Sequence, residues 1–395
     1  MNNIVTQKNT ENPEEIFIVA GEASGDLHGA KLVKAIKKLS PSIKITGIGG
    51  DKMAEAGVNL LIHSGDMAVM GLLEVITCLG KIMHAMKVAS QYLRDNRPSL
   101  LILIDYPGFN FILANRAKKL GIPIFYYICP QVWAWRQKRV KKMEQFIDKA
   151  AVILPFEEAF LRSHNIDAEF VGNPLTESVK TDSNPQKSLQ AAGIDTNKPI
   201  LGLLPGSRHG EVNRLFPRLA KATKLILKEN PNIQPVVGLA PSITRDQIAE
   251  MAESIGILDK LQFFKGNIYN LMSCSRLILI ASGTATLEAA LTNTPMIVVY
   301  ALNEISYLIG KPLIKVKYAS LVNLIEDKMV VPELLQHDAT PEKIAAMALK
   351  LLNDPDQLAQ IKNDLSKIRK KLGENRASER AASLALTLIN QKSNP

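Results

Sequence analysis

Short apolar runs alternate along this chain with longer stretches in which apolar residues recur at helical spacing. Residues 16–20 form such a run, which ends in the loop GEASGD and is followed by a helical pattern from His28 to Leu39. Further runs occupy residues 100–104, 122–128, 151–154 and 168–171. Short strands that alternate with helices favour parallel βαβ units, in which helices cover both faces of the sheet. The pattern therefore predicts a doubly wound α/β fold.

The alternation begins a second time after a polar segment at residues 181–186, TDSNPQ, which is typical of a linker. The strands expected in this second series are residues 200–204, 234–239, 261–264, 277–280 and 296–299. From residue 341 to residue 391 the pattern is helical only. We therefore expect one Rossmann-like domain over residues 1–180, a second over residues 186–345, and C-terminal helices over residues 346–395. Two such domains would share a ligand cleft at the carboxyl ends of their sheets.

Composition narrows the classes of protein. The chain has 395 residues, 46% hydrophobic and 22% charged, which excludes a disordered protein. Its three cysteines are too few for a disulfide scaffold, and neither they nor the six histidines show metal-ligand spacing, so we expect no metal and no cofactor. No apolar run reaches the about 20 residues of a membrane span, and the N-terminus does not have the pattern of a secretory signal. These features indicate a cytoplasmic protein.

The formal net charge is +10, which points to an anionic partner: nucleic acid, a membrane surface or a phosphorylated substrate. Residues 130–149 hold six basic and two acidic residues beside both tryptophans of the chain. This combination suits anionic head groups at a membrane interface, although a solvated basic helix is the alternative. No nucleic-acid motif accompanies the charge, so we expect no nucleic-acid partner.

A methionine-rich segment at residues 67–86 carries few charges. Methionine side chains suit adaptable apolar surfaces, so the segment could line a groove for acyl chains or touch a bilayer. An ordinary buried helix is the alternative.

Two loops of the first series carry carboxylates. GEASGD (21–26) follows a strand and opens a helix, but it is neither a dinucleotide-binding motif nor a P-loop. Its acidic residues suit sugar hydroxyls or a substrate amide, and the alternative is acidic capping of the helix. Asp105 follows the run 100–104, which places it at the carboxyl edge of a parallel sheet. Apolar neighbours would raise its pKa toward that of a general base, and the alternative is an aspartate that starts a turn.

Two loops of the second series suit phosphate. Pro205-Gly-Ser-Arg208 ends in an arginine that can hold a phosphate with two hydrogen bonds, and a surface arginine is the alternative. Ser282-Gly-Thr-Ala-Thr-Leu-Glu288 offers backbone amides and hydroxyls at a helix start. Glu288 could accept hydrogen bonds from ribose hydroxyls, with an exposed helical glutamate as the alternative. Both loops place a nucleotide in the second domain.

Nine short motifs follow one another along the chain: GEASGD (21–26), MGLLE (70–74), DYPGFN (105–110), QVWAW (131–135), FVGNP (170–174), LPGSR (204–208), SGTATLE (282–288), SLVNL (320–324) and ELLQ (333–336). In this order they resemble the lipid-A-disaccharide synthase family, from about residue 16 to about residue 352. Two segments depart from the family pattern: Cys129-Pro-Gln131 stands where Ser-Pro-Ser is expected, and Lys317-Tyr318-Ala319 where Asp-Tyr-Val is possible.

The resemblance implies a GT-B fold, two Rossmann-like domains that face a cleft, and a metal-independent inverting glycosyl transfer. It also implies that the C-terminal helices of residues 346–395 cross back to the first domain. The donor would be UDP-2,3-diacylglucosamine and the acceptor 2,3-diacylglucosamine 1-phosphate (lipid X), giving a β(1→6)-linked disaccharide 1-phosphate and UDP. It further implies peripheral association with the anionic inner membrane of a Gram-negative cell, and a homodimer is possible. The alternatives are another GT-B enzyme acting on UDP-GlcNAc and a non-catalytic protein that binds lipid or nucleotide sugar at a membrane surface.

The expected site residues follow from the loops and the resemblance together. Asp105 is the expected catalytic base. The expected donor-binding residues are Ser207, Arg208, Ser282, Gly283, Thr284, Glu288, Asn323 and Gln336. The expected acceptor or sugar-binding residues are Glu22, Ser24, Asp26 and His28. The expected acyl-chain or membrane-facing residues are Met67, Met70, Leu72, Leu73, Trp133, Trp135, Arg136, Arg139 and Lys142.

Overall fold

The computed structural model describes residues 14–67, 75–134, 139–302 and 316–393, which form two compact units. Unit 1 runs to Pro174 and includes the chain again from Asn375; unit 2 comprises Leu175–Glu374. The first unit therefore ends six residues before the expected boundary at residue 180. The C-terminal helices are not a separate part: those before residue 375 belong to unit 2, and only the last belongs to unit 1.

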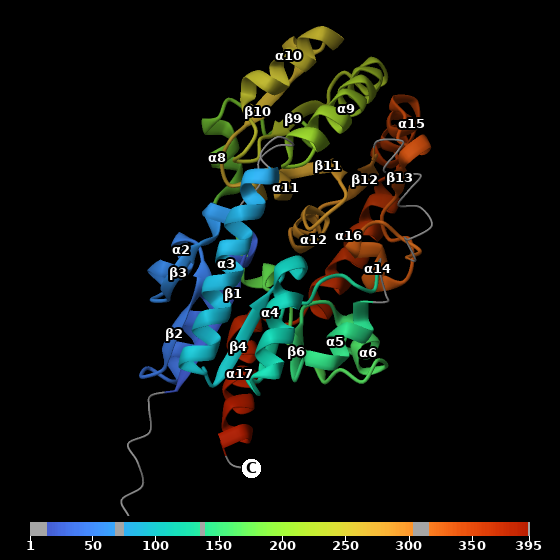
Figure 1. The fold of residues 1–395 in the computed structure, drawn as a ribbon. Coiled ribbons are helices and arrows are strands. Elements are labelled where there is room, and N and C mark those ends of the chain that lie inside the picture. The colour runs from blue at the N-terminus through green and yellow to red at the C-terminus, as the bar shows by residue number, and fades with distance from the viewer. Residues whose placement is uncertain (1–13, 68–74, 135–138, 303–315, 394–395) are drawn as a thin grey trace, which may run out of the picture. The chain divides into compact units, whose positions relative to one another are not determined.

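Unit 1 is built on a parallel sheet with the strand order β3-β2-β1-β4-β5-β6-β7 (Figure 1). Its strands are β1 (Glu15–Ala20), β2 (Lys44–Gly49), β3 (Asn59–His63), β4 (Leu100–Ile104), β5 (Ile124–Tyr127), β6 (Lys149–Val152) and β7 (Ala168–Phe170). The sequence did not predict β2 and β3. Gly47 of β2 lies so close to β1 that an added Cβ would meet the Ile18 carbonyl oxygen at 1.9 Å. The close approach of β2 to β1 thus requires glycine at position 47. Glycine is unfavourable in strands, so it weakens the sequence pattern by which β2 could have been predicted.

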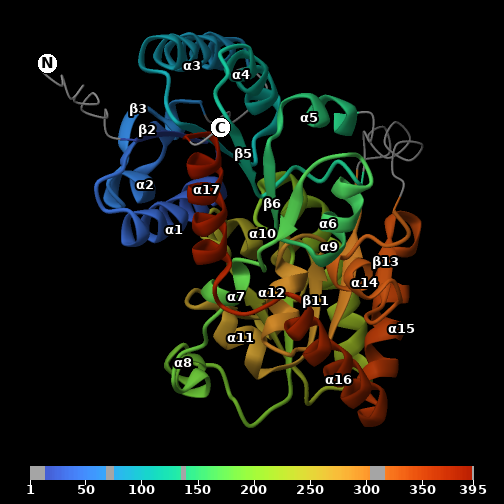
Figure 2. The ribbon, with the colours of Figure 1, turned by 90° about the horizontal axis from the view of Figure 1, so that it is seen from below.

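Helices cover both faces of the unit 1 sheet. The helices are α1 (Ala23–Leu39), α2 (Asp51–Glu55), α3 (Val75–Asn96), α4 (Pro107–Lys119), α5 (Val140–Phe146), α6 (Pro155–Arg162) and α17 (Ala377–Ser393), with a 3-10 turn η1 at Ser64–Met67. On β1, Ile16 and Ile18 pack with α1, α2 and α17, whereas Phe17 and Val19 pack with α3 to α6. Figure 2 shows α17 beside α1. Burial on both faces explains why the central strands are apolar throughout.

Unit 2 repeats this plan with the strand order β10-β9-β8-β11-β12-β13. Its strands are β8 (Ile200–Leu204), β9 (Gln234–Gly238), β10 (Gln262–Phe264), β11 (Ser275–Ala281), β12 (Met296–Tyr300) and β13 (Glu333–Leu335), of which only β13 was not predicted. Its helices are α7 (Leu175–Ser178), α8 (Pro185–Ala191), α9 (His209–Glu229), α10 (Arg245–Ile255), α11 (Ile268–Cys274), α12 (Ala285–Leu291), α14 (Leu321–Glu326), α15 (Pro341–Leu352) and α16 (Pro355–Lys371), with 3-10 turns η3 (Leu258–Lys260) and η5 (Gln336–Asp338).

In both sheets the strand order reverses at one point, between β1 and β4 in unit 1 and between β8 and β11 in unit 2. Ligands of doubly wound sheets bind outside the carboxyl ends of the strands at such switch points. The fold thus singles out the loops that follow these four strands. Among the described residues, no helix is long and apolar enough to cross a bilayer.

Candidate functional site

Two carboxylates lie at the switch point of unit 1. Asp105 directly follows β4, and Glu22 comes two residues after β1, with which β4 pairs side by side. Glu22 is exposed and Asp105 is half-buried. Burial raises the pKa of Asp105 above its ordinary value, and the negative charge of Glu22 raises it further. The structure thus brings together two residues that the sequence predicted in one site.

The backbone around Asp105 adopts a left-handed turn. Asp105 and Tyr106 both have φ of +45°, and Ile128, which follows β5, has φ of +59°. A left-handed conformation costs a non-glycine residue about 1–2 kcal/mol, and such strained residues gather at functional sites. The Tyr106 ring also lies over Gly21, where an added Cβ would meet it at 2.3 Å. Sequence reasoning did not single out Tyr106.

Asp26 serves the fold instead of the site. Its carboxylate accepts hydrogen bonds from the backbone N–H groups of Gly50, Lys52 and Met53, at 2.7, 3.0 and 3.0 Å. It therefore satisfies the free amides at the start of α2. The expectation that Asp26 binds a sugar is corrected, because this carboxylate is buried and committed to α2. Ser24 is exposed in the first turn of α1, and His28 is half-buried one turn further along.

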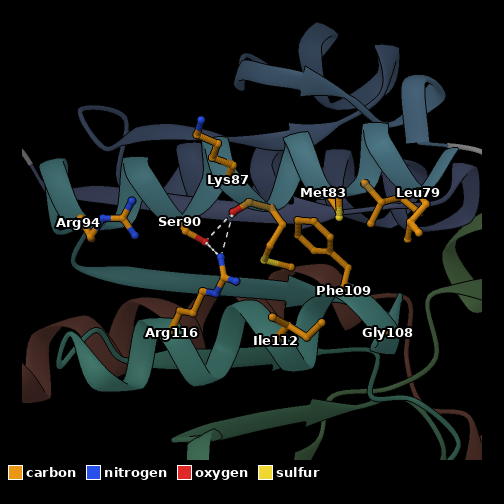
Figure 3. Close-up of a pocket in the computed structure, with 11 residues that line it drawn as sticks. Leu79, Met83, Lys87, Ser90, Arg94, Gly108, Phe109, Ile112 and Arg116 are labelled. Carbon is orange, nitrogen blue, oxygen red and sulfur yellow. Dashed lines mark hydrogen bonds between the residues drawn. The ribbon is translucent and has the colours of Figure 1, made fainter. Parts of the chain in front are cut away.

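An apolar groove of about 710 Å³ lies between α3 and α4 (Figure 3). It is lined by Leu79, Ile82, Met83, Met86, Lys87, Ser90, Arg94, Gly108, Phe109, Ile112 and Arg116. Met83 and Ile112 are 62% and 52% exposed, which is unusual for side chains of this size. Every charged residue in the lining is basic, and the Arg116 guanidinium donates a hydrogen bond of 2.6 Å to the Ser90 hydroxyl. The groove includes the first turn of α4, which directly follows the Asp105 turn.

Four residues of the groove lie in the methionine-rich segment of the sequence: Leu79, Ile82, Met83 and Met86. The Met67 side chain, and residues Met70, Leu72, Leu73, Trp135 and Arg136, lie outside the part of the chain that the structure describes. Their expected contact with lipid stays a prediction.

The prediction that Trp133 faces a membrane is wrong. Its side chain is buried, packs edge-on against Phe156 with ring centroids 4.9 Å apart, and donates its indole N–H to the Glu157 carboxylate at 2.9 Å. Glu157 also accepts hydrogen bonds from the N–H groups of Ile153 and Leu154. Burial raises the pKa of Glu157 to about 7. Sequence reasoning missed Glu157, because nothing in its local pattern signals a buried carboxyl.

Among the described basic residues of 130–149, Lys149 lies apart from the others. Lys142 is exposed on α5, and the Arg139 guanidinium lies 5.9 Å from the centre of the Phe111 ring. Lys149 lies in β6, where it forms an ion pair with Asp167 at 3.0 Å. The charge of Lys149 is therefore paired with a carboxylate beside β6 and is not part of a basic patch around Lys142.

The switch point of unit 2 brings the two phosphate-type loops together, because β8 and β11 are paired neighbours. Ser207 and Arg208 are exposed just before α9, and Gly206 has φ of +119°, a conformation that favours glycine. The other loop exposes Gly283 and Thr284 before α12. In the described residues, no three His, Cys, Asp or Glu side chains are grouped to hold a metal ion.

Ser282 and Glu288 are half-buried in the second of these loops. The Ser282 hydroxyl donates to the Ala319 carbonyl at 2.9 Å, so this side chain holds one loop against another. Burial raises the pKa of Glu288.

Two of the expected donor-binding side chains are used by the fold. Asn323 is fully buried: its amide donates to Val331 and Glu333, and its carbonyl oxygen accepts from the N–H groups of Val330 and Val331. Gln336 accepts from the Leu302 N–H at 2.9 Å and donates to the Leu302 carbonyl at 3.0 Å. The expectation that Asn323 binds the donor is corrected, because its buried amide is held by the segment around β13. Gln336 is half-buried and its amide can form further hydrogen bonds, so its contact with the donor stays a prediction.

Comparison with solved structures identifies the class. The fold is similar to that of UDP-GlcNAc 2-epimerase from Neisseria meningitidis, with a TM-score of 0.65, 12% identity, and coverage of 94% of this chain and 99% of that one. It is also similar to the calicheamicin glycosyltransferase CalG4, with a TM-score of 0.60, 15% identity, and coverage of 98% and 100%. Two parallel sheets of this order, each with a loop cluster at its switch point, define a GT-B protein.

The sequence identifies the family. A family model described as lipid-A-disaccharide synthetase matches residues 16–388. The lipid-A-disaccharide synthase of Syntrophus aciditrophicus is 46% identical over 96% of this chain and 98% of that protein. That of Nitrosococcus oceani is 42% identical over 95% and 96%. The chain belongs to the lipid-A-disaccharide synthase family, whose members are glycosyltransferases of lipid A synthesis.

Proposed function

We propose that the chain transfers a 2,3-diacylglucosaminyl group from UDP-2,3-diacylglucosamine to 2,3-diacylglucosamine 1-phosphate. The 6-hydroxyl of the acceptor attacks the anomeric carbon of the donor. The bond from that carbon to UDP breaks, and a β(1→6) bond forms with inversion. The observation that carries the proposal is Asp105: a half-buried carboxyl of raised pKa, at the switch point of unit 1, next to an apolar groove.

Asp105 is the proposed general base that takes the proton of the attacking hydroxyl. A base works best when its pKa lies near the working pH. Burial and the negative charge of Glu22 both shift the pKa of Asp105 in that direction. Exposed Glu22 and Ser24, in the neighbouring loop, are proposed to hold sugar hydroxyls. His28 stays a predicted contact of the same loop.

The departing UDP needs positive charge and hydrogen-bond donors. Arg208, with the exposed backbone of Ser207, Gly283 and Thr284, is proposed to supply them from unit 2. Glu288 is proposed to accept hydrogen bonds from the ribose. Ser282 is proposed to act through the loop that its hydroxyl holds.

The acyl chains of a substrate need an apolar surface, and the α3–α4 groove is proposed to receive one. Its basic side chains suit the phosphate that the acceptor carries. The same surface, with Arg139 and Lys142, is proposed to meet the anionic inner membrane. A homodimer stays a prediction.

The test is turnover of UDP-2,3-diacylglucosamine and lipid X, with mass detection of the disaccharide 1-phosphate. We expect Asp105→Ala to lower turnover at least ~100-fold, the effect typical of losing a general base. UDP affinity, measured by calorimetry, should persist. The matched control is Asp95→Asn, which changes an exposed carboxylate on α3. Near-normal turnover by the Asp105 variant would remove it as the base. No product from the unsubstituted chain, with UDP still bound, would favour a non-catalytic binding protein.

A further inference from the structure

We propose that Asn110 and Tyr126 are positioning residues that hold the left-handed turn of Asp105 and thereby aim its carboxyl. This inference rests on the proposed function, in which Asp105 is the base. Neither residue belongs to the exposed surface of the site: both side chains are fully buried, Asn110 on α4 and Tyr126 on β5.

Both side chains converge on one atom. The Asp105 backbone carbonyl oxygen accepts a hydrogen bond of 2.6 Å from the Asn110 amide and another of 2.6 Å from the Tyr126 hydroxyl. Asn110 also donates to the carbonyl of Ile104 at 3.2 Å. A carbonyl can only accept, so both contacts orient the peptide between Asp105 and Tyr106.

That peptide joins the two residues with φ of +45°, so it is the part of the turn that most needs support. The other side of Asp105 is held by its N–H, which donates to the Ile128 carbonyl at 3.3 Å. A rotation of this peptide would carry the Asp105 carboxyl away from the switch point. The two donors therefore control where the carboxyl points without touching a substrate.

Burial of the Asn110 side chain carries a cost in free energy that an apolar residue at this position would avoid. Its Oδ1 atom is buried without a hydrogen-bond partner. An apolar side chain would avoid this orphaned acceptor. What the asparagine supplies in return is an N–H₂ group aimed at two consecutive carbonyls, which an apolar side chain lacks. The residue type thus fits the task of holding the turn.

The main test variant is Tyr126→Phe, which removes one hydroxyl and keeps the ring in the core. Its matched control is Tyr127→Phe, the same change one residue along β5, on the opposite face of the sheet. We expect Tyr126→Phe to lower kcat about tenfold, equivalent to ~1.4 kcal/mol. The KM for UDP-2,3-diacylglucosamine and the affinity for UDP should stay within about twofold, as should every parameter of the control.

A pH profile of kcat/KM distinguishes a misdirected Asp105 carboxyl from a general loss of folding stability. Burial holds the pKa of Asp105 above its ordinary value, so a carboxyl released toward solvent regains a lower pKa. The acid limb of kcat/KM should therefore move to lower pH in Tyr126→Phe. Asn110→Leu, which has a similar volume but no N–H group to donate to the two carbonyls, should move it in the same direction and lower kcat further. A loss of stability alone would leave the limb in place.

The inference is overturned if Tyr126→Phe matches Tyr127→Phe in kcat and in the acid limb. It is also overturned if Tyr126→Phe and the Asn110 variant lose activity only in proportion to the fall in their melting temperatures. Asp105→Asn is assayed beside them. If that variant keeps turnover, the proposed base and this inference fail together. If it is inactive while Tyr126→Phe is normal, only the positioning role is wrong.

Discussion

At the scale of single residues, burial decides which side chains can do chemistry. Asp105 and Glu288 are carboxyls whose pKa burial raises while they remain partly open to solvent. Asp26 and Asn323 also stand in motifs that the sequence assigned to ligand binding. Their side chains instead accept hydrogen bonds from backbone N–H groups. Cys129, one of the two departures from the family pattern, is buried as well, so its side chain does not present a thiol to a ligand.

Glu157 gives a prediction about stability. Its pKa is about 7 in the folded chain and, by the ordinary value for glutamate, 4.5 in the unfolded chain. Between these values the folded state holds a proton that the unfolded state releases. Its contribution is therefore fully present below about pH 4.5 and is lost as the pH rises through 7. The loss over this window amounts to about 3 kcal/mol.

The measurement is urea unfolding of the unsubstituted chain and of Glu157→Gln at pH 5 and pH 8, followed by tryptophan fluorescence. Both tryptophans of the chain lie in unit 1, so the signal reports on that unit. The advantage of the unsubstituted chain over the variant should shrink by about 2.5 kcal/mol between the two pH values, because at pH 5 the unfolded carboxyl is already mostly ionised. Parallel curves would show that Glu157 does not titrate in this window.

At the scale of elements, the packing of α3 against α4 creates a surface that neither helix has alone. Each helix carries apolar side chains toward solvent at the groove, including Leu79 and Met83 on α3 and Ile112 on α4. The basic residues Lys87, Arg94 and Arg116 lie along the same groove (Figure 3). Apolar and basic groups together are what an anionic lipid surface attracts.

We expect Met83→Asp and Ile112→Asp each to weaken binding to vesicles that contain anionic phospholipid, by about tenfold or more. The physical reason is that each adds a negative charge and removes apolar surface from the groove. The control is Leu39→Asp, which makes the same kind of change at an exposed leucine on α1, 54% exposed and remote from the groove residues in the sequence. Vesicle flotation measures the effect. Binding by Met83→Asp and Ile112→Asp equal to that of Leu39→Asp would contradict the proposed contact of this groove with a membrane.

At the scale of the whole molecule, the chain leaves unit 1 at Pro174 and returns to it at Asn375. The returning helix α17 completes one face of the first core with small and aliphatic side chains, among them Ala381, Ala385 and Ile389. Ion pairs of Lys38 with Glu379 at 3.2 Å and of Glu169 with Arg380 at 3.7 Å lie beside this contact. Helix α17, near the end of the chain, thus contributes to the stability of unit 1.

Ile389→Ala should lower the stability of unit 1 by about 2–5 kcal/mol, the usual cost of such a cavity in a core. Ile389 is 2% exposed, whereas Thr387, two residues earlier on α17, is exposed and serves as the matched control in Thr387→Ala. Tryptophan fluorescence follows the unfolding of unit 1, and calorimetry with UDP follows the site proposed in unit 2. A change of less than ~0.5 kcal/mol would contradict the role of α17 in the first core.

The sequence by itself determined most of the alternation of strands and helices, because periodicity and apolar runs are local signals, but it missed β2, β3 and β13. It also located the loops that follow β1, β4, β8 and β11, since the end of an apolar run marks the carboxyl edge of a parallel sheet. Only the tertiary structure decided that Trp133 donates to Glu157, that buried Asn323 bonds to the segment around β13, and that the Tyr126 hydroxyl donates to the Asp105 carbonyl. These outcomes depend on contacts between residues distant in the sequence, which no local pattern records.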